Sequence, residues 1–262
     1  MNDALTPLAV RRLARAGRWP GSTRGAVEGV VQCNLVVLPG AEADAFGAWC
    51  ERNAEVAPVI ARTAPGVAAL PALGEDLDLR FDLPAYNLFE RGQRVGEVPD
   101  LAARWREDTV GFVFGCSFSL EDALRAHGIP LDYEARGFGG AIYLTNRPTV
   151  AAGAYAGPLV VSMRPLPAAW TERAVAVSRQ YPLLHGAPVH VGDPGALGLR
   201  LDEPMQSLGP PSIADGEVPV FWACGVTTQL VLANANPVWA ASHVSARMLV
   251  TDVPISAMHV AG

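Results

Sequence analysis

Twice in this chain, an apolar segment typical of a buried strand runs through a cysteine directly into a helical pattern. The first is TVGFVFGCSFSLEDALRAHG at 109–128, with Cys116 at the junction. The second is VPVFWACGVTTQLVLANA at 218–235, with Cys224 in the same place. Strands that lead straight into helices are typical of α/β proteins. Such proteins bind ligands at these turns, where free backbone N–H groups attract anions.

Strand and helix patterns alternate through most of the remaining chain. Strands are expected at 30–39, 109–114, 141–145, 158–163, 187–193, 218–224 and 247–253, with a hairpin at 86–96. Helices are expected at 7–17, 42–53, 99–108, 167–180 and 227–235, and one that starts at an N-cap Ser119 and stops at Gly128. This order predicts an α/β fold with a mixed sheet flanked by helices.

Glycine and strand residues are denser in one segment than elsewhere. The segment 129–165 predicts a smaller α+β subdomain, set into a main α/β domain of 1–128 and 166–262. The length of 262 residues is enough for either arrangement to bury a core.

Composition limits the function classes. No apolar run approaches the roughly 20 residues of a membrane span, and the first residues lack the apolar region of a signal peptide, so we expect a cytoplasmic protein without membrane contact. The net charge is −6 and the basic residues are scattered, which argues against nucleic-acid binding. We expect a small-molecule acid as substrate and a homo-oligomer as the assembly.

All 20 basic residues are arginine, because the chain contains no lysine. A lysine Schiff base, and with it conventional pyridoxal phosphate catalysis, is therefore excluded. Cys33, Cys50, Cys116 and Cys224 form no CxxC pair, so reduced thiols are expected in a cytosolic chain. We predict no cofactor and no defined metal site, although the sequence leaves a divalent metal open.

The two cysteine turns supply the first candidate site residues. A helix N-terminus lowers the pKa of a thiol, so Cys116 and Cys224 are candidate catalytic groups; the alternative is that each is a small buried hydrophobe. Ser117, Ser119 and Thr227 are placed to form an anion cradle beside them. The paired turns predict that both cysteines lie on the same side of one sheet and line a shared cleft.

A loop rich in histidine and glycine supplies the second group. In HGAPVHVGDPG at 185–195, His190 is a candidate base oriented by Asp193, and His185 is a candidate substrate contact. The alternative is a turn whose histidines are merely hydrogen-bonded.

Two further residues are candidate substrate contacts. Arg164 ends a predicted strand and could bind a carboxylate through two parallel hydrogen bonds, unless it forms a surface ion pair. Glu217 begins a predicted strand, where simple exposure is the alternative.

Several of these segments are long, unusual and ordered as in one bacterial family. They are GCSFSLE (115–121), GPLVVSMRPL (157–166), HGAPVHVGDP (185–194), EVPVFWACGVTTQ (217–229) and MLVTD (248–252). Over about residues 25–253 the chain resembles the YcsI-like family of bacterial proteins, which is also called the putative hydro-lyase family. The animal relatives of this family include the mitochondrial D-glutamate cyclase. The resemblance implies a two-part α/β protein with carbon–oxygen lyase activity. The cyclase closes glutamate to 5-oxoproline with loss of water.

The chain also departs from the family pattern. Leu144 stands where the family pattern has an arginine, and Thr228 stands where it has a proline. Arg247 stands where the pattern has a second histidine after the position of His243. The resemblance therefore implies a specialised relative with a changed substrate.

The leading hypothesis is a hydro-lyase that dehydrates or cyclises a small amino or carboxylic acid. One alternative is a cysteine-dependent acyl transferase or amidohydrolase, which rapid inactivation by iodoacetamide would support. The other is a non-catalytic protein that binds small acids, which binding without turnover would support.

Overall fold

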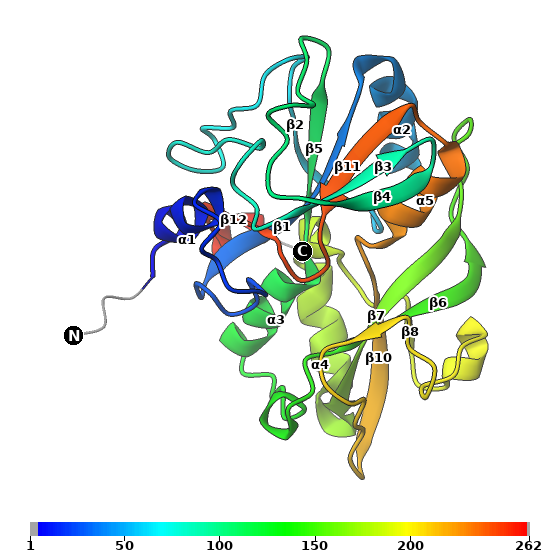
Figure 1. The fold of residues 1–262 in the computed structure, drawn as a ribbon. Coiled ribbons are helices and arrows are strands. Elements are labelled where there is room, and N and C mark those ends of the chain that lie inside the picture. Colours follow the sequence, from blue (N-terminus) through cyan, green and yellow to red (C-terminus); the bar gives the residue numbers. More distant parts are fainter. Residues whose placement is uncertain (1–4, 261–262) are drawn as a thin grey trace.

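The computed structural model describes residues 5–260 and contains two β-sheets with helices packed around them (Figure 1). Seven strands form the first sheet in the order β2-β5-β1-β11-β3-β4, with β12 paired to β1 beside this path. Their bounds are β1 Val30–Leu38, β2 Val59–Arg62, β3 Tyr86–Glu90, β4 Gln93–Val98, β5 Val110–Gly115, β11 Trp239–His243 and β12 Leu249–Pro254.

The second sheet has five strands in the order β8-β10-β7-β6-β9. Their bounds are β6 Ala141–Pro148, β7 Pro158–Pro167, β8 His190–Val191, β9 Gln206–Ser207 and β10 Glu217–Ala223. The segment 129–165 thus supplies β6 and β7, and their partners come from 190–223. The second sheet includes more of the chain than the predicted subdomain.

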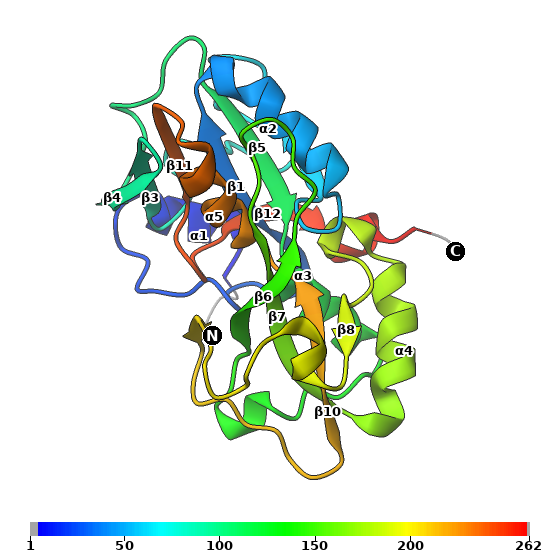
Figure 2. The ribbon, with the colours of Figure 1, turned by 90° about the vertical axis from the view of Figure 1, so that its right-hand side faces the viewer.

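Five α-helices lie within the described residues. They are α1 Pro7–Arg15, α2 Gly40–Arg52, α3 Ser117–Ala126, α4 Ala168–Arg179 and α5 Thr227–Ala235. Figure 2 shows α2 against the first sheet and α4 alongside β10 of the second. The predicted α/β class is confirmed, but the strands divide between two sheets and every strand pairing is antiparallel.

The core is continuous across both sheets. On the first sheet, Phe46 of α2 packs edge-on against Phe112 of β5, with ring centroids 5.1 Å apart, and both side chains are fully buried. On the second sheet, the indole N–H of Trp222 donates to the Ser178 hydroxyl of α4 at 3.2 Å. Aromatic packing and one buried hydrogen bond therefore fix a helix on each sheet.

Three sequence predictions of local structure are wrong. The segment 99–108 forms turns rather than a helix, because its groups bond to distant backbone: Leu101 N–H donates to the Arg80 carbonyl and the Trp105 indole to the Gly66 carbonyl. The strand at 187–193 shrinks to the two residues of β8.

The start of α3 also differs from the prediction. Its N-cap is Cys116, whose extended backbone ends β5, and the helix begins at Ser117. Ser119 therefore lies inside the first turn and caps nothing. Gly128 ends the segment as expected, with φ +73° just beyond the helix.

Candidate active site

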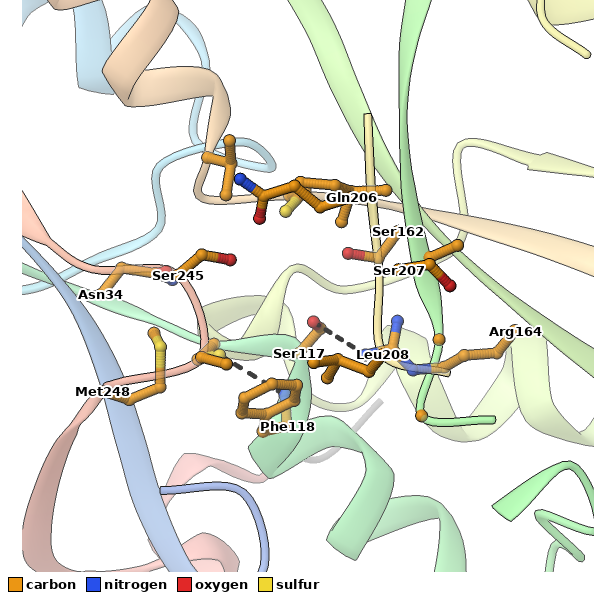
Figure 3. Close-up of a pocket in the computed structure, with 18 of the residues that line it drawn as sticks. Asn34, Ser117, Phe118, Ser162, Arg164, Gln206, Ser207, Leu208, Ser245 and Met248 are labelled. Carbon is orange, nitrogen blue, oxygen red and sulfur yellow. Dashed lines mark hydrogen bonds between the residues drawn. The ribbon is translucent and has the colours of Figure 1, made fainter. Parts of the chain in front are cut away.

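A cavity of about 440 Å³ lies where the N-terminal ends of α3 and α5 approach each other (Figure 3). We call it the central cavity. Cys116, Ser117 and Phe118 line it from the start of α3, and Cys224 and Val226 line it from the residues before α5. Because the first N–H groups of each helix point along its axis, both ends favour an anion between them.

Arg164 of β7 supplies the cationic side chain of the central cavity. Its side chain is 4% exposed; Nη2 donates to the Ser117 hydroxyl at 3.0 Å and Nε donates to the Glu121 carboxylate. Nη1 is buried and has no hydrogen-bond partner among the described residues. Burial lowers the pKa of Arg164, but the Glu121 carboxylate outweighs this and raises it, so the guanidinium stays charged.

Glu121 of α3 holds this guanidinium in place. The Glu121 side chain is nearly inaccessible, and its second oxygen forms an ion pair with Arg24 at 2.8 Å. The Tyr133 hydroxyl donates to the same carboxylate at 3.4 Å. The carboxylate is thus shared by two arginines, which leaves Arg164 free to interact with a further anion in the cavity.

Cys116 and Cys224 line the cavity as protonated thiols. Burial raises the pKa of Cys116 to about 12, although the N–H of Phe118 donates to its sulfur at 3.5 Å. Burial also raises the pKa of Cys224, against hydrogen bonds from Ser162 and from the Val226 N–H. Neither thiol is a preformed nucleophile, and both are placed to donate a proton.

The two cysteine turns are held together by one side chain. The Nδ2 group of Asn34, on β1, donates to the carbonyl of Gly115, immediately before Cys116. A Cβ atom at Gly225, immediately after Cys224, would collide with the same Asn34 side chain. Glycine at 225 therefore permits the close approach that brings the second turn to the first.

The cysteine prediction is correct in part. Cys116 follows β5 of the first sheet and Cys224 follows β10 of the second, so the prediction of one shared sheet is wrong. Both nevertheless line the central cavity, so the predicted shared cleft is confirmed.

His243 of β11 lines the cavity and was not among the predicted site residues. Burial lowers its pKa to about 4, so the imidazole is neutral at pH 7. Its Nδ1 lies 3.2 Å from the Leu35 N–H and 3.4 Å from the Leu35 carbonyl, so backbone groups of β1 hold the ring in place. His243 is therefore a neutral imidazole in the cavity wall, and the only sequence signal for it was its place in the family motif.

The predicted base and its orienter lie outside the central cavity. His190 Nε2 contacts the backbone carbonyl of Asp193 at 2.7 Å, while the Asp193 carboxylate accepts from the Gly195 N–H at 2.9 Å. The imidazole and the carboxylate therefore form no catalytic pair. Their loop forms β8 at the edge of the second sheet, and neither residue lines the cavity.

Four other predicted contacts also lie outside the lining. His185 is buried and bonds to the Glu55 carbonyl at 3.0 Å. Glu217 forms an ion pair with Arg136 at 2.6 Å. The Ser119 hydroxyl bonds to Gln32, and the Thr227 hydroxyl accepts from Val160 N–H at 3.0 Å and donates to the Cys224 carbonyl at 2.7 Å. Ser119 and Thr227 thus support the two turns from behind.

The family departures lie outside the lining as well. Leu144 is 45% exposed on β6, and Arg247 is 3.6 Å from the Glu97 carboxylate. Thr228 is buried in the first turn of α5, where its hydroxyl donates to the Gly225 carbonyl at 2.7 Å.

No group of three or more histidine, cysteine, aspartate or glutamate side chains within residues 5–260 is arranged to hold a metal ion. Within the same residues no helix is both long and apolar enough to cross a bilayer.

The fold and the cavity define an α/β protein whose central cavity lies at two helix N-termini and contains a buried arginine. Residues 110–252 match the family model described as D-glutamate cyclase. This match covers more than half of the chain, and the chain belongs to the D-glutamate cyclase family.

Curated bacterial relatives match nearly the whole chain, and each is named "Putative hydro-lyase". The relative from Afipia carboxidovorans is 41% identical, with 98% of this chain and 95% of the relative covered. Relatives from Gluconacetobacter diazotrophicus and Rhizobium johnstonii are each 46% identical, with 95% and 96% of this chain and 90% and 94% of the relatives covered. The expectation of a lyase-type enzyme is confirmed at the level of the family.

One solved structure, a nitrogen repressor-like protein from Methanococcus jannaschii, aligns over 94% of this chain and 95% of its own. Its TM-score is 0.40 at 14% identity, a likeness that supports no conclusion about function.

Proposed function

We propose that this protein is a carbon–oxygen lyase that removes water from a small amino or carboxylic acid held in the central cavity. Simple dehydration and lactam closure of the D-glutamate cyclase type both belong to this class. The observation that carries the proposal is Nη1 of Arg164, a buried cationic donor without a partner among the described residues, on a side chain that lines the cavity. A buried charged donor of this kind is costly unless a ligand completes it.

The lining supplies the groups that lactam closure needs. In this reaction the amine nitrogen attacks the distal carboxyl carbon, one carbon–oxygen bond breaks, and water leaves. Arg164 and Ser117 bind one carboxylate, and the helix ends stabilise negative charge that develops on oxygen. The neutral imidazole of His243 and the two protonated thiols are the groups of the lining that exchange protons with the amine and with the departing oxygen.

The first test is turnover of D-glutamate to 5-oxoproline, followed by proton NMR together with L-glutamate and 2-hydroxyglutarate as comparison acids. Arg164→Gln should lower the rate about 10²- to 10³-fold, the usual cost of losing one donor to developing charge. Arg164→Lys keeps the charge but loses the planar fork, and should weaken binding less.

Arg200→Gln is the matched control, because Arg200 is 68% exposed and pairs with Asp202 away from the cavity. Binding of these acids without any product would replace this proposal with a non-catalytic acid-binding protein. Full activity of an Arg164→Gln variant would show that Arg164 takes no part in binding or catalysis.

The cysteine-dependent acyl transferase is the weaker alternative, because burial raises the pKa of both cavity thiols. Rapid inactivation by iodoacetamide, prevented by a bound acid, would favour it. Full activity of a variant with both cavity cysteines changed to alanine would exclude it.

Three further expectations belong to the proposal. Exchanging a carbon–oxygen bond for a carbon–nitrogen bond needs only proton transfers, so we propose a reaction without an organic cofactor. A cytoplasmic location and a homo-oligomeric assembly remain predictions.

A further inference from the structure

The two cavity thiols occupy similar positions at the ends of their strands. Each cysteine directly follows the last residue of a strand; Cys116 is the N-cap of α3, and Cys224 lies two residues before the N-cap of α5. Each sulfur accepts a hydrogen bond from the N–H two residues further on. These donors are Phe118 N–H for Cys116 and Val226 N–H for Cys224. Their common place after a strand and in the lining of one cavity points to a shared task.

The thiols reach the cavity from different walls. Cys116 comes from the first sheet and the start of α3, and Cys224 comes from the second sheet and the residues before α5. In Figure 3 the start of α3, marked by Ser117 and Phe118, lies below the cavity, and α5 lies above it. A small molecule between these walls has one thiol toward each of two faces.

Arg164, which we call the carboxylate anchor, lies between the same walls. Arg164 reaches Ser117 at the start of α3, and its unpartnered Nη1 is the donor left for a ligand (Figure 3). A cation at a carboxylate stabilises the negative charge that the carboxylate gains when the neighbouring Cα loses its proton. The anchor thus both orients a 2-substituted acid and makes its Cα hydrogen more acidic.

We propose that the central cavity also exchanges and inverts the Cα hydrogen of the acid it binds, as a cofactor-independent racemase or epimerase. This proposal depends on the proposed function in one respect only: both require Arg164 to bind the carboxylate of the acid. As the pH rises one cysteine loses its proton to solvent, and the resulting thiolate takes the Cα proton while the electron pair of the broken C–H bond is delocalised into the carboxylate. The other cysteine, as thiol, gives its proton to the opposite face of Cα.

The step balances without any further reactant. The first cysteine ends as a thiol and the second as a thiolate, and proton exchange with water restores the starting state. Nothing is oxidised or reduced, and no group leaves. The activity interconverts the two configurations at Cα, so it would supply the enantiomer that the lyase reaction consumes.

The protonation states predict the pH dependence. Burial raises the pKa of both thiols, and Arg164 lowers both. Cys224, Glu121 and Cys33 are the neighbouring acidic groups of Cys116, so ionisation of one thiol makes ionisation of the other harder. The pair titrates jointly, and the exchange rate should rise with pH from neutral into the alkaline range.

The experiment follows deuterium at Cα in D2O. D- and L-glutamate and D- and L-2-hydroxyglutarate are each incubated with the full chain, with NMR for the Cα signal and chiral chromatography for inversion. We expect deuterium at Cα and formation of the opposite enantiomer from at least one pair. Cys116→Ser and Cys224→Ser should each slow inversion about 10²- to 10⁴-fold, the usual contribution of one acid–base group.

Each single variant should still exchange the Cα hydrogen of one enantiomer only. The enantiomer that Cys116→Ser exchanges should be the one that Cys224→Ser does not. A purely structural role of the thiols would not give this reciprocal pattern. Cys50→Ala is the matched control, because Cys50 is equally buried but lies on α2 and does not line the cavity. It should leave exchange unchanged.

Two results would overturn the inference: no deuterium at Cα of any of the four acids, or exchange that survives both serine substitutions unchanged. Lactam formation without Cα exchange would overturn it and leave the proposed function intact. Cα exchange without loss of water would support it and contradict the proposed function.

Discussion

Arg164 shows how one buried side chain organises the site. Its three nitrogen groups have three separate roles: Nε is held by Glu121, Nη2 by Ser117, and Nη1 is left for a ligand. A buried charge is tolerated only when it is paired, and Glu121 provides this pairing without using Nη1.

Ser117 and Ser119 allow the binding role to be separated from the structural role. Ser117→Ala removes the acceptor for Arg164 Nη2 and should raise KM about tenfold, because a hydrogen bond to a charged group contributes about 1.5 kcal/mol. Steady-state kinetics on D-glutamate, or on the acid that the turnover panel identifies, measures this change.

Ser119→Ala is the matched variant two residues further along α3. It removes the hydroxyl that accepts from Gln32 N–H at 2.7 Å, so it should cost about 1–3 kcal/mol of unfolding free energy with KM unchanged. Urea denaturation measures this loss. If instead Ser119→Ala raised KM and Ser117→Ala did not, the assignment of the two serines would be reversed.

Some site residues were predictable because their chemistry is local. Cys116, Ser117 and Cys224 follow strands and precede helices, and Arg164 carries the donor that carboxylates need. The His190 and Asp193 pair failed because short polar loops satisfy their own backbone groups: the imidazole bonds to a carbonyl and the carboxylate to an N–H. His243 could not be chosen from sequence spacing, since its neighbour Leu35 lies 208 positions away.

At the scale of elements, the sequence predicted what local periodicity controls. The patterns for α1, α2, α4 and α5 are confirmed with small shifts at their ends. β11 was missed, because WAASH has little β-branched character and becomes a strand by pairing with β1 and β3 on either side. The helix predicted at 99–108 was wrong for the opposite reason, since tertiary hydrogen bonds override its helical composition.

One wall of the cavity is formed by a short strap, residues 205–209, that contains β9. Gln206, Ser207 and Leu208 line the cavity, and the strap is held to β6 and the preceding glycines by few backbone bonds, such as Leu208 N–H to the Gly140 carbonyl at 3.0 Å. Because β9 is a two-residue strand at the edge of its sheet, the strap is expected to open more easily than the central strands.

Gly209→Ala tests this wall. Gly209 has φ +83°, and a Cβ there would collide with the Gly137 carbonyl, so the strap must shift. We expect faster amide hydrogen exchange at 205–209 and a higher KM. Gly216→Ala is the control, because its φ is +81° with open space around the Cβ position. A Gly209→Ala protein with unchanged exchange and KM would show that the strap is no part of the site.

At the scale of the whole molecule, two sheets share one continuous core and meet at the cavity. The sequence predicted the α/β class, but it could not assign strands to sheets, because pairings such as β1 with β12 join segments about 220 residues apart. The same long separation explains why the cavity could not be assembled from sequence, although two of its turns were recognised.

Stability should fall with acid because two histidines are buried in the neutral state. Burial lowers the pKa of His185 and of His243 from about 6.5 to about 4. The unfolded chain therefore binds more protons between these values, so their contribution is complete above pH 6.5 and is lost as the pH falls toward 4. Between pH 7 and 5 the contribution of each histidine to the unfolding free energy should fall by about 2 kcal/mol, because a tenfold change in proton affinity corresponds to about 1.36 kcal/mol.

Urea denaturation at pH 7, 6 and 5 measures this dependence. His185→Gln should reduce the dependence of the unfolding free energy on pH, because the group that the unfolded state protonates is gone. His190→Asn, on the edge loop outside the core, should leave the slope in place. An equal slope in all three proteins would contradict the buried neutral state of His185.

Asn34 and His243 lie near opposite ends of the chain, and both line the cavity that β5, β7 and β10 approach from the middle. Because β11 and β12 complete the sheet around β1, a chain still being synthesised cannot close the cavity until its last strands have left the ribosome. The cavity is therefore complete only in the finished chain, and any ligand that it holds can bind only after the last step of folding.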